Sequence, residues 1–241
     1  MRLDKYLADM KIGTRSELKK AIRAKAVTVN GKTVRDPAAQ VSEDDQICWH
    51  GKPVKYESLV YYMLHKPAGI ISASADSREK TVVDLIQEDT RKDLFPVGRL
   101  DRDTEGLLLI TNDGTLAHRL LSPKHHVEKM YFAVVTGPVT EEDIAAFRDG
   151  ITLEDGTLCR PAVLEKETGK ETGDRPLSPI RITITEGKFH QIKRMFQARG
   201  KEVLYLKRIS MGPLTLDPAL PPGAYRRLTD EELSLLKQAQ S

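Results

Sequence analysis

The chain of 241 residues contains little cysteine and no long apolar run. Its two cysteines, Cys48 and Cys159, lie far apart and outside any C-x-x-C motif, which argues against a disulfide framework and a cysteine-rich metal site. No stretch approaches the roughly 18 apolar residues of a membrane-spanning helix, and the N-terminus lacks the apolar core of a signal peptide. We therefore expect a cytoplasmic protein that is neither exported nor inserted in a membrane.

Sequence motifs of several enzyme classes are absent as well. The chain has no G-x-S-x-G turn around a nucleophilic serine, no G-x-x-x-x-G-K-[ST] phosphate loop and no dinucleotide-binding G-x-G-x-x-G. The six histidines form no H-E-x-x-H motif, and the pair His125-His126, with His118 seven residues before it, has no cysteine ligand nearby. These absences argue against acyl transfer, nucleotide hydrolysis, a redox cofactor and a bound metal.

What the chain does have is an uneven distribution of charge. Its net charge is only +3, but residues 1–40 contain ten Lys or Arg against four Asp or Glu. The capping-box spacing of Thr14 and Glu17 predicts a helix from about Arg15 to Ala24. Basic residues recur every four positions on its exposed face, which is typical either of a solvated surface or of a phosphate-binding stripe. The Asn30-Gly31 pair then predicts a tight hairpin turn.

This N-terminal segment resembles the S4 RNA-binding domain. The resemblance is carried by residues 2–7, 14–15, 27–31 and 41–47. Ala26 departs from the pattern, because a glycine is usual there. The resemblance implies a small domain of helices and a small sheet over residues 1–55, in which we interpret residues 51–55 as a polar linker. The expected RNA contacts are Arg2, Lys5, Arg15, Lys19, Lys20 and Arg23.

The stretch from Gly98 to Gly106 holds Asp101 beside two arginines. Its glycines allow tight turns, and the apolar run 107–110 predicts a buried strand, so we expect Asp101 at the edge of a core. A calcium loop is disfavoured because Asn112 stands where a bidentate Glu is needed. A glycosidase pair of Asp101 and Asp103 is disfavoured because the two residues are too close in sequence to flank a sugar.

A helix predicted over residues 189–199 supplies a partner for this acid. With Phe189 on its apolar face, the helical repeat turns Lys193 inward. A buried ammonium group needs an acidic partner, and Asp101 can serve as one. An ordinary structural ion pair would explain the same pattern, and Tyr131 would equally fit an ordinary core position.

Further patterns indicate the fold class. Strands are predicted near residues 61–64 and 181–185, and helices are predicted after Thr140 and Thr229, each with an acid at capping distance. We interpret a tandem Lys-Glu-Thr-Gly repeat in residues 166–173 as a solvated hairpin tip. Strands with scattered helices favour an α+β fold over a regular βαβ series.

The second part of the chain, residues 56–241, resembles the RsuA-like pseudouridine synthases. The catalytic motif of that family matches Gly98-Arg99-Leu100-Asp101 with Thr104, Gly106-Leu107-Leu108 and residues 111–114. Supporting motifs match in order at Lys66-Pro67, Glu128-Lys129-x-Tyr131, residues 186–195 and Leu206-x-Arg208-x-x-x-Gly212. His65 departs from the pattern, since relatives usually have asparagine there. The resemblance implies a domain with a mixed, mainly antiparallel sheet flanked by helices.

The resemblance also implies the isomerisation of a uridine in RNA to pseudouridine, without a cofactor. Asp101 would be the essential acid, acting either as a nucleophile on the ribose or as a base for a C2′ proton. Tyr131 would stack on the base, and Lys193 would hold Asp101 ionised. Arg99 and Arg194 would bind phosphate or brace the loop, and Leu206 would form a wall of the pocket.

The segment from Ser122 to Lys129 is more similar to the small-subunit branch of this family than to its large-subunit branches. It implies ribosomal RNA as the partner, specifically 16S RNA in a small-subunit assembly intermediate, and a monomeric enzyme. Two alternatives stay open: a large-subunit (23S) synthase and a non-catalytic RNA-binding assembly factor. The second would have no reason to keep Asp101, Tyr131 and Lys193 together.

Overall fold

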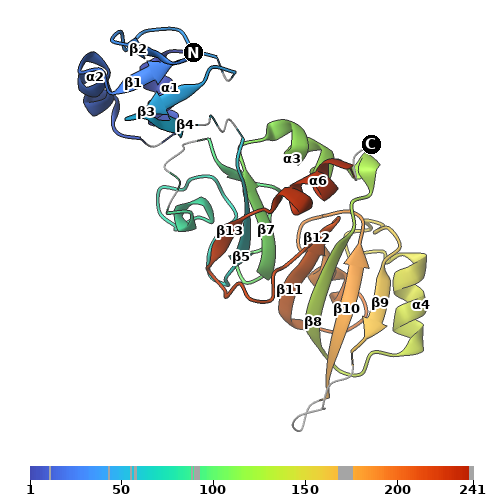
Figure 1. Cartoon of the computed structure of the whole chain (residues 1–241). Coiled ribbons are helices and arrows are strands. Elements are labelled where there is room, and N and C mark those ends of the chain that lie inside the picture. Colours follow the sequence, from blue (N-terminus) through green and yellow to red (C-terminus); the bar gives the residue numbers. More distant parts are fainter. Residues whose placement is uncertain are drawn as a thin grey trace. The chain divides into compact units, whose positions relative to one another are not determined.

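The computed structural model describes residues 1–10, 12–42, 44–54, 56, 59–87, 89, 93–167 and 176–238. The chain forms two compact units, a smaller one of residues 1–60 and a larger one that contains residues 61–87 and 93–241 (Figure 1). Each unit has its own apolar core. Within the described residues, no helix is long and apolar enough to cross a membrane.

The smaller unit packs two helices against a four-stranded antiparallel sheet. The helices are α1 (Leu3–Asp9) and α2 (Arg15–Arg23). The strands, in the spatial order β2-β1-β3-β4, are β1 (Val27–Val29), β2 (Lys32–Val34), β3 (Ile47–Trp49) and β4 (Lys52–Val54). The apolar faces of both helices and the inner face of the sheet share one core, which contains Leu3, Leu7, Leu18, Ile22, Val27 and Ile47.

Two local predictions for this unit can be compared with the structure. The helix that begins at Arg15 is confirmed, and its capping box is complete, because the Thr14 side chain accepts from the Glu17 N–H and the Glu17 carboxylate accepts from the Thr14 N–H. Ala26 does not take the left-handed conformation that favours glycine. The preceding Lys25 takes it instead, with φ of 70°.

Both hairpins of this sheet turn on two consecutive left-handed residues. Asn30 and Gly31 have φ of 51° and 77°, which confirms the predicted turn. The pair at 50–51 has φ of 47° and 78° and leads into β4, so the interpretation of residues 51–55 as a linker is wrong. Glycine and proline suggested an irregular segment, but Pro53 lies on an outer strand, where its missing N–H is tolerated.

The larger unit is built on a mixed sheet whose main path is β13-β5-β7-β11-β8-β10-β9. Its strands are β5 (Tyr61–Lys66), β7 (Glu105–Thr111), β8 (Lys129–Thr136), β9 (Val163–Lys166), β10 (Leu177–Ile184), β11 (Val203–Met211) and β13 (Tyr225–Arg227), with short β6 (Phe95–Pro96) on β7 and β12 (Leu214–Thr215) on β11. Strands β7 and β11 run parallel, and the other pairs run antiparallel. The α+β class with a mainly antiparallel mixed sheet is confirmed.

Helices flank this sheet. They are α3 (Gly114–Leu121), α4 (Glu141–Asp149), α5 (Gln191–Gln197) and α6 (Asp230–Gln238), with short 3₁₀ segments η1 (Val83–Leu85) and η2 (Pro123–His125). The predicted caps at Thr140 and Thr229 are both present. Most of the tandem repeat, residues 168–173, lies outside the described residues.

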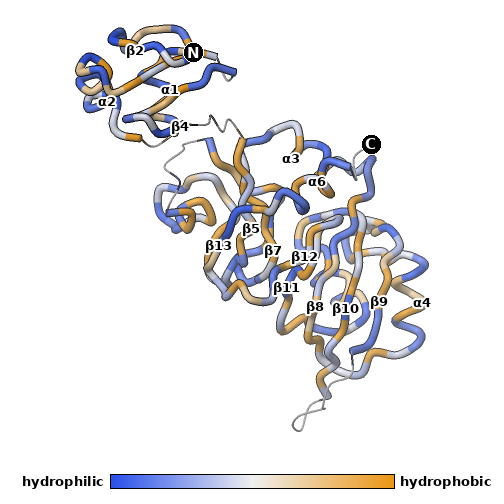
Figure 2. The backbone as a smooth tube through the Cα atoms, in the orientation of Figure 1, coloured by the Kyte–Doolittle hydropathy of each residue, from blue (hydrophilic) through white to orange (hydrophobic). Residues whose placement is uncertain are grey.

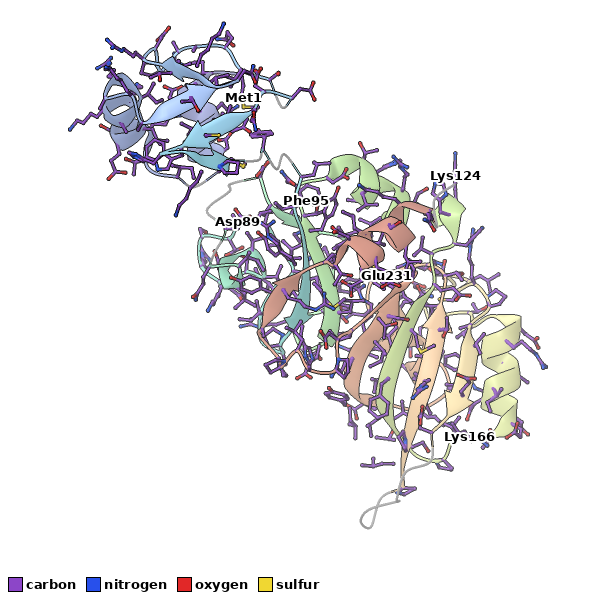
Figure 3. The ribbon with its side chains drawn as sticks, in the orientation of Figure 1. Met1, Asp89, Phe95, Lys124, Lys166 and Glu231 are labelled. Carbon is purple, nitrogen blue, oxygen red and sulfur yellow. The ribbon has the colours of Figure 1, made fainter. Side chains whose placement is uncertain are left out.

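The core beside the central strands comes from β7 and the helices over it. The run 107–110 is fully buried, as predicted, and is coloured as hydrophobic in Figure 2. Its Leu107 and Leu109 pack with buried leucines of α3 and α6, and Phe95, labelled in Figure 3, packs against the same cluster. Strand β7 is thereby fixed, and so is the loop of residues 97–104 that enters it, here called the Asp101 loop.

Candidate active site

The backbone on both sides of Asp101 is held by hydrogen bonds. The Ser72 hydroxyl donates to the Leu100 carbonyl at 2.8 Å and accepts from the Leu100 N–H at 3.1 Å. A turn closes after the acid, where the Thr104 N–H donates to the Asp101 carbonyl at 3.1 Å. The Asp101 carboxyl group is 26% exposed. It therefore lies at the edge of a core, as the sequence predicts, and is open to a ligand.

Lys66 supports the same loop through hydrogen bonds from its buried side chain. It is completely buried at the end of β5. Its ammonium group donates to the carbonyl oxygens of Pro67, Arg102 and Thr104 at 3.0, 3.1 and 2.9 Å. Burial lowers the pKa of Lys66 to about 8, although nearby carboxylates, Asp103 first among them, act in the opposite direction. The sequence marks this lysine only as part of a motif and does not reveal this role.

Gly106 lets β7 approach β11 closely. Its φ is +107°, and a Cβ atom there would lie 2.2 Å from the carbonyl oxygen of Arg208. No side chain fits in that space. Arg208 is itself buried and donates from Nε to the Leu107 carbonyl at 2.7 Å. The end of the Asp101 loop is thus fastened to a strand about one hundred residues further along the chain.

Lys193 lies between two carboxylates. Its Nζ is 3.3 Å from an oxygen of Asp101, which confirms the predicted pair, but it is closer to Asp103, at 2.6 and 2.8 Å. The hydrogen bond from Lys193 holds the pKa of Asp103 below its usual range. The predicted pairing is therefore right but incomplete, because the lysine is shared.

Helix α5 begins at Gln191, two residues later than predicted. His190 has φ of 48°, a left-handed conformation that cannot belong to the helix. Phe189 consequently lies outside the helix and is 76% exposed, so its predicted place on the apolar face is wrong. Ile192 and Phe196 are buried as expected, and they set the phase that directs Lys193 toward Asp101.

One pocket collects most of the predicted site residues. Tyr131 on β8 and Leu206 on β11 are nearly buried in its walls, whereas Arg99 is exposed at its rim. The strands β8 and β11 are neighbours in the sheet, which brings these distant positions together. The pocket is lined by Arg99, Leu100, Asp101, Thr104, Tyr131, Ile184, Gly187, Lys188, His190, Gln191, Ile192, Lys193 and Leu206.

Arg194 is the predicted site residue that does not line this pocket. Its guanidinium group contacts Asp155 at 2.5 Å and the Phe189 carbonyl at 3.5 Å. Of the two roles expected for it, phosphate binding or bracing, these contacts correspond to bracing. The segment that it supports includes His190, whose Nε2 lies 3.5 Å from Asp101.

His190 and its neighbours are site residues that reasoning from residue patterns did not single out. The Gln191 side chain accepts from the Lys188 N–H at 2.9 Å and donates to Glu186 at 2.9 Å. Glu186 also accepts from the Arg160 N–H at 3.0 Å. Residues 186–195 matched a family motif in the sequence, but the spacing of residues in that motif did not predict a turn held by hydrogen bonds.

His65 contacts a different part of the unit. It is buried on β5, and its Nδ1 donates to the Leu220 carbonyl at 2.6 Å. Its backbone N–H donates to Ala224, in the segment that leads into β13. The departure from asparagine at this position therefore affects the β13 side of β5, whereas the next residue, Lys66, supports the Asp101 loop.

The basic residues predicted to bind RNA are all exposed on the smaller unit. The carboxyl group of Asp4 is buried, and its hydrogen bonds from Arg2 lower its pKa against the effect of burial. The charges of Arg15 and Lys19 lower the pKa of Asp4 further. The remaining members of the set, also exposed, are Lys5, Lys20 and Arg23.

Chemically, the pocket offers one accessible carboxylate beside an ammonium group, an aromatic wall and an aliphatic wall. Such a carboxylate can act as a nucleophile or a base on a ligand that lies against Tyr131 and Leu206. Among the described residues, no three His, Cys, Asp or Glu side chains are grouped so as to hold a metal ion.

Two family models match the chain. The model described as RNA pseudouridylate synthase matches residues 60–198, and the S4 domain model matches residues 1–47. The chain is 49% identical to an uncharacterized RNA pseudouridine synthase, YtzG, of Bacillus subtilis, with 100% of both chains covered. It is 39% identical to ribosomal small subunit pseudouridine synthase A of Escherichia coli, covering 97% of this chain and 99% of that one.

A solved structure shares the whole architecture. It is a crystal structure of a pseudouridylate synthase that is 38% identical to this chain, with a TM-score of 0.66. The match covers 98% of this chain and 99% of the other.

Proposed function

Because this chain belongs to the RNA pseudouridylate synthase family and carries an S4 domain, we propose that it converts one uridine of 16S ribosomal RNA to pseudouridine, with Asp101 as the single catalytic acid. The observation that supports this assignment is the pocket in which the Asp101 carboxylate lies beside Lys193 and faces the walls formed by Tyr131 and Leu206. The similarity to small-subunit synthases over nearly the full length favours 16S RNA as the substrate.

The reaction is an isomerisation, so no atom is gained or lost. The bond between C1′ and N1 of the uridine breaks, the uracil turns, and a bond forms between C1′ and C5. The C5 proton leaves, and N1 gains a proton. Asp101 starts this sequence in one of two ways. It attacks C1′ and forms an ester bond that breaks when C5 bonds to C1′, or it removes the C2′ proton and returns it when that bond forms. Both routes need an ionised carboxylate. The ammonium group of Lys193 lies 3.3 Å from this carboxylate.

The detached uracil must stay in place while it turns. Tyr131 offers a flat face for stacking, which is worth on the order of 1 to 3 kcal/mol for base–aromatic contacts. Leu206, on the neighbouring strand, extends the same wall with an apolar surface that excludes water. Stacking and apolar contacts have little directional preference about the ring axis, so they can hold the base and still allow it to turn.

A uridine in folded RNA must leave its stack to enter the pocket, at a cost of a few kcal/mol. Phosphate contacts must offset this cost. Arg99 at the rim and the exposed cations of the S4 domain are suited to supply them. We further propose that the enzyme is a cytoplasmic monomer and that its substrate is RNA within a small-subunit assembly intermediate.

The test is the variant Asp101→Asn in a strain that lacks the wild-type gene. Carbodiimide treatment and primer extension over 16S and 23S RNA then map every pseudouridine. We expect one 16S pseudouridine to be lost on deletion, restored by the wild-type gene and not restored by Asp101→Asn. The matched control is Asp149→Asn, the same change at an exposed carboxylate on α4, which keeps the catalytic acid and should restore the modification.

Three results would contradict parts of this proposal. Full modification by Asp101→Asn would exclude a catalytic role for that acid. A lost site in 23S instead of 16S RNA would reassign the enzyme to the large subunit. An unchanged pseudouridine pattern on deletion would favour an RNA-binding assembly factor without activity.

A further inference from the structure

We propose that Phe189 and His190 form a stacking platform at the mouth of the pocket for the base next to the target uridine. The inference rests on the proposed function, since it concerns the RNA that this function requires. Phe189 is the most exposed large hydrophobic residue of the described part of the chain, at 76%. A phenylalanine that exposed contributes little to the fold, so its position calls for another explanation.

The two rings are stacked on one another and lead to the catalytic acid. Their centroids are 3.8 Å apart, and their planes differ by 17°. His190 lines the pocket, and its Nε2 is 3.5 Å from an oxygen of Asp101. The exposed Phe189 ring is therefore the outer end of a stack whose inner end touches the acid. A base that continues this stack would be separated from Asp101 by the two rings.

The backbone holds these rings in place before any ligand arrives. His190 takes the left-handed conformation, which is costly for a residue with a side chain and persists only when its surroundings fix it. The Gln191 N–H donates to the Lys188 carbonyl at 3.2 Å, and Arg194 ties the Phe189 carbonyl to Asp155. A platform fixed in this way loses little conformational entropy when a base binds to it.

The charges around the rings select a nucleic acid over an apolar protein surface. Lys188, which is paired with Glu186, and the exposed Arg99 line the pocket with His190, and Phe189 is the exposed aromatic ring beside them. A single flat ring flanked by cations is suited to a base with phosphates on either side. When the target uridine leaves its stack, its neighbour loses a stacking partner, and Phe189 can replace that partner.

The experiment uses the full-length enzyme and short RNA hairpins that contain the mapped uridine. If the wild type modifies no free hairpin, the same sequences are placed in 16S RNA and assembled into small-subunit particles. One hairpin is intact, and two others carry an abasic site immediately 5′ or 3′ of that uridine. The variants are Phe189→Ala, Phe189→Trp and, as a matched control, Val163→Ala, which trims an exposed apolar side chain on the outer strand β9. Pseudouridine formation is followed under single-turnover conditions, and thermal unfolding verifies that each variant is folded.

On the intact hairpin, Phe189→Ala should lower kcat/KM by about 5- to 150-fold, as expected for the loss of one base–aromatic stack, mainly through KM. Phe189→Trp and Val163→Ala should remain close to the wild type. On one of the abasic hairpins, the wild type should fall to the level of Phe189→Ala, and the substitution should cost nothing further.

Several outcomes would overturn this inference alone. The first is that Phe189→Ala has wild-type kinetics on the intact hairpin. The second is that Phe189→Ala lowers kcat/KM equally on all three hairpins. The third is that Phe189→Ala changes the oligomeric state on sedimentation, which would make Phe189 part of an interface between copies. If the wild-type enzyme modifies none of the hairpins and no ribosomal site, the proposed function itself fails. The two failures are thus distinguishable.

Discussion

The two units of this protein use positive charge in opposite ways. In the smaller unit, lysines and arginines are exposed on α1 and α2, above a core of aliphatic side chains. In the larger unit, Lys66, Lys129 and Arg208 are buried, and each donates to backbone carbonyl groups. Exposed cations act over a distance on a polyanion, whereas buried ones fix the backbone beside them.

From this difference we predict which substitutions should slow the reaction and which should weaken binding to RNA. Substitution of a buried lysine leaves backbone carbonyl groups without hydrogen-bond donors, so the local backbone must move. Substitution of an exposed lysine only weakens the electrostatic attraction between the protein and RNA. Three predictions test this contrast, beginning with the largest effect.

Lys66→Met should have the largest effect, because the carbonyl groups of the Asp101 loop lose their shared donor. We expect pseudouridine formation to fall at least about 100-fold, since a displacement near 1 Å can cost that much. The same change at the exposed Lys166, labelled in Figure 3, should alter the rate less than about twofold. Single-turnover rates for both variants make the comparison, and equal rates would remove the distinction between buried and exposed cations.

Asp143→Asn should lower the free energy of unfolding by about 3 kcal/mol at neutral pH, because it leaves Arg199 and Lys201 without their buried partner. Burial alone would raise the pKa of Asp143, but hydrogen bonds led by that from Lys201 lower it to about 2. The stabilisation is therefore complete above the ordinary value of 3.8 and is lost as the pH falls toward about 2.

Denaturant unfolding of this variant across pH is the measurement. Wild type and Asp143→Asn should converge in stability as the pH approaches 2. A matched control is Asp149→Asn on the same helix, where the carboxylate is 77% exposed and the change should stay within about 0.5 kcal/mol. A constant difference between wild type and Asp143→Asn from pH 7 to pH 2 would refute the assigned ionisation.

The double variant Arg15→Ala, Lys19→Ala should have the smallest effect on the fold, within about 0.5 kcal/mol. It should weaken RNA binding and reduce the slope of log affinity against log salt by about 1 to 2, without changing the rate at saturating RNA. Binding titrations at several salt concentrations test this. Lys32→Ala with Lys52→Ala, exposed lysines on β2 and β4, is the control, and an identical slope change there would show that no particular face binds RNA.

Much of the fold follows from local patterns in the sequence. Helix α2 was predicted because one polar pair caps it and its apolar face has helical spacing. Strand β7 was predicted because an uninterrupted aliphatic run needs burial on both faces. The inward direction of Lys193 was predicted from a helical phase that included Phe189, and Asp101 was then named as a plausible acidic partner. Ile192 and Phe196 keep that phase although Phe189 lies outside α5.

The errors share a physical origin in left-handed backbone conformations. Gly51 leads into β4, and His190 delays α5, but neither conformation can be recognised from hydrophobic spacing. The hydrogen bond from Lys193 to Asp103 and the support of the loop by Lys66 both depend on the backbone path of the Asp101 loop, which spacing does not reveal. The meeting of Tyr131 and Leu206 depends on strand register, so only the family resemblance could anticipate it.

The parallel contact of β7 with β11 has a consequence for the order of folding. Each hairpin of the smaller unit pairs residues that are close in sequence, whereas Gly106 must find Arg208. Closing so long a loop is slow relative to local pairing. During synthesis, the S4 domain can therefore fold while the ribosome is still making the larger unit, and the Asp101 loop takes its final form only after β11 has emerged.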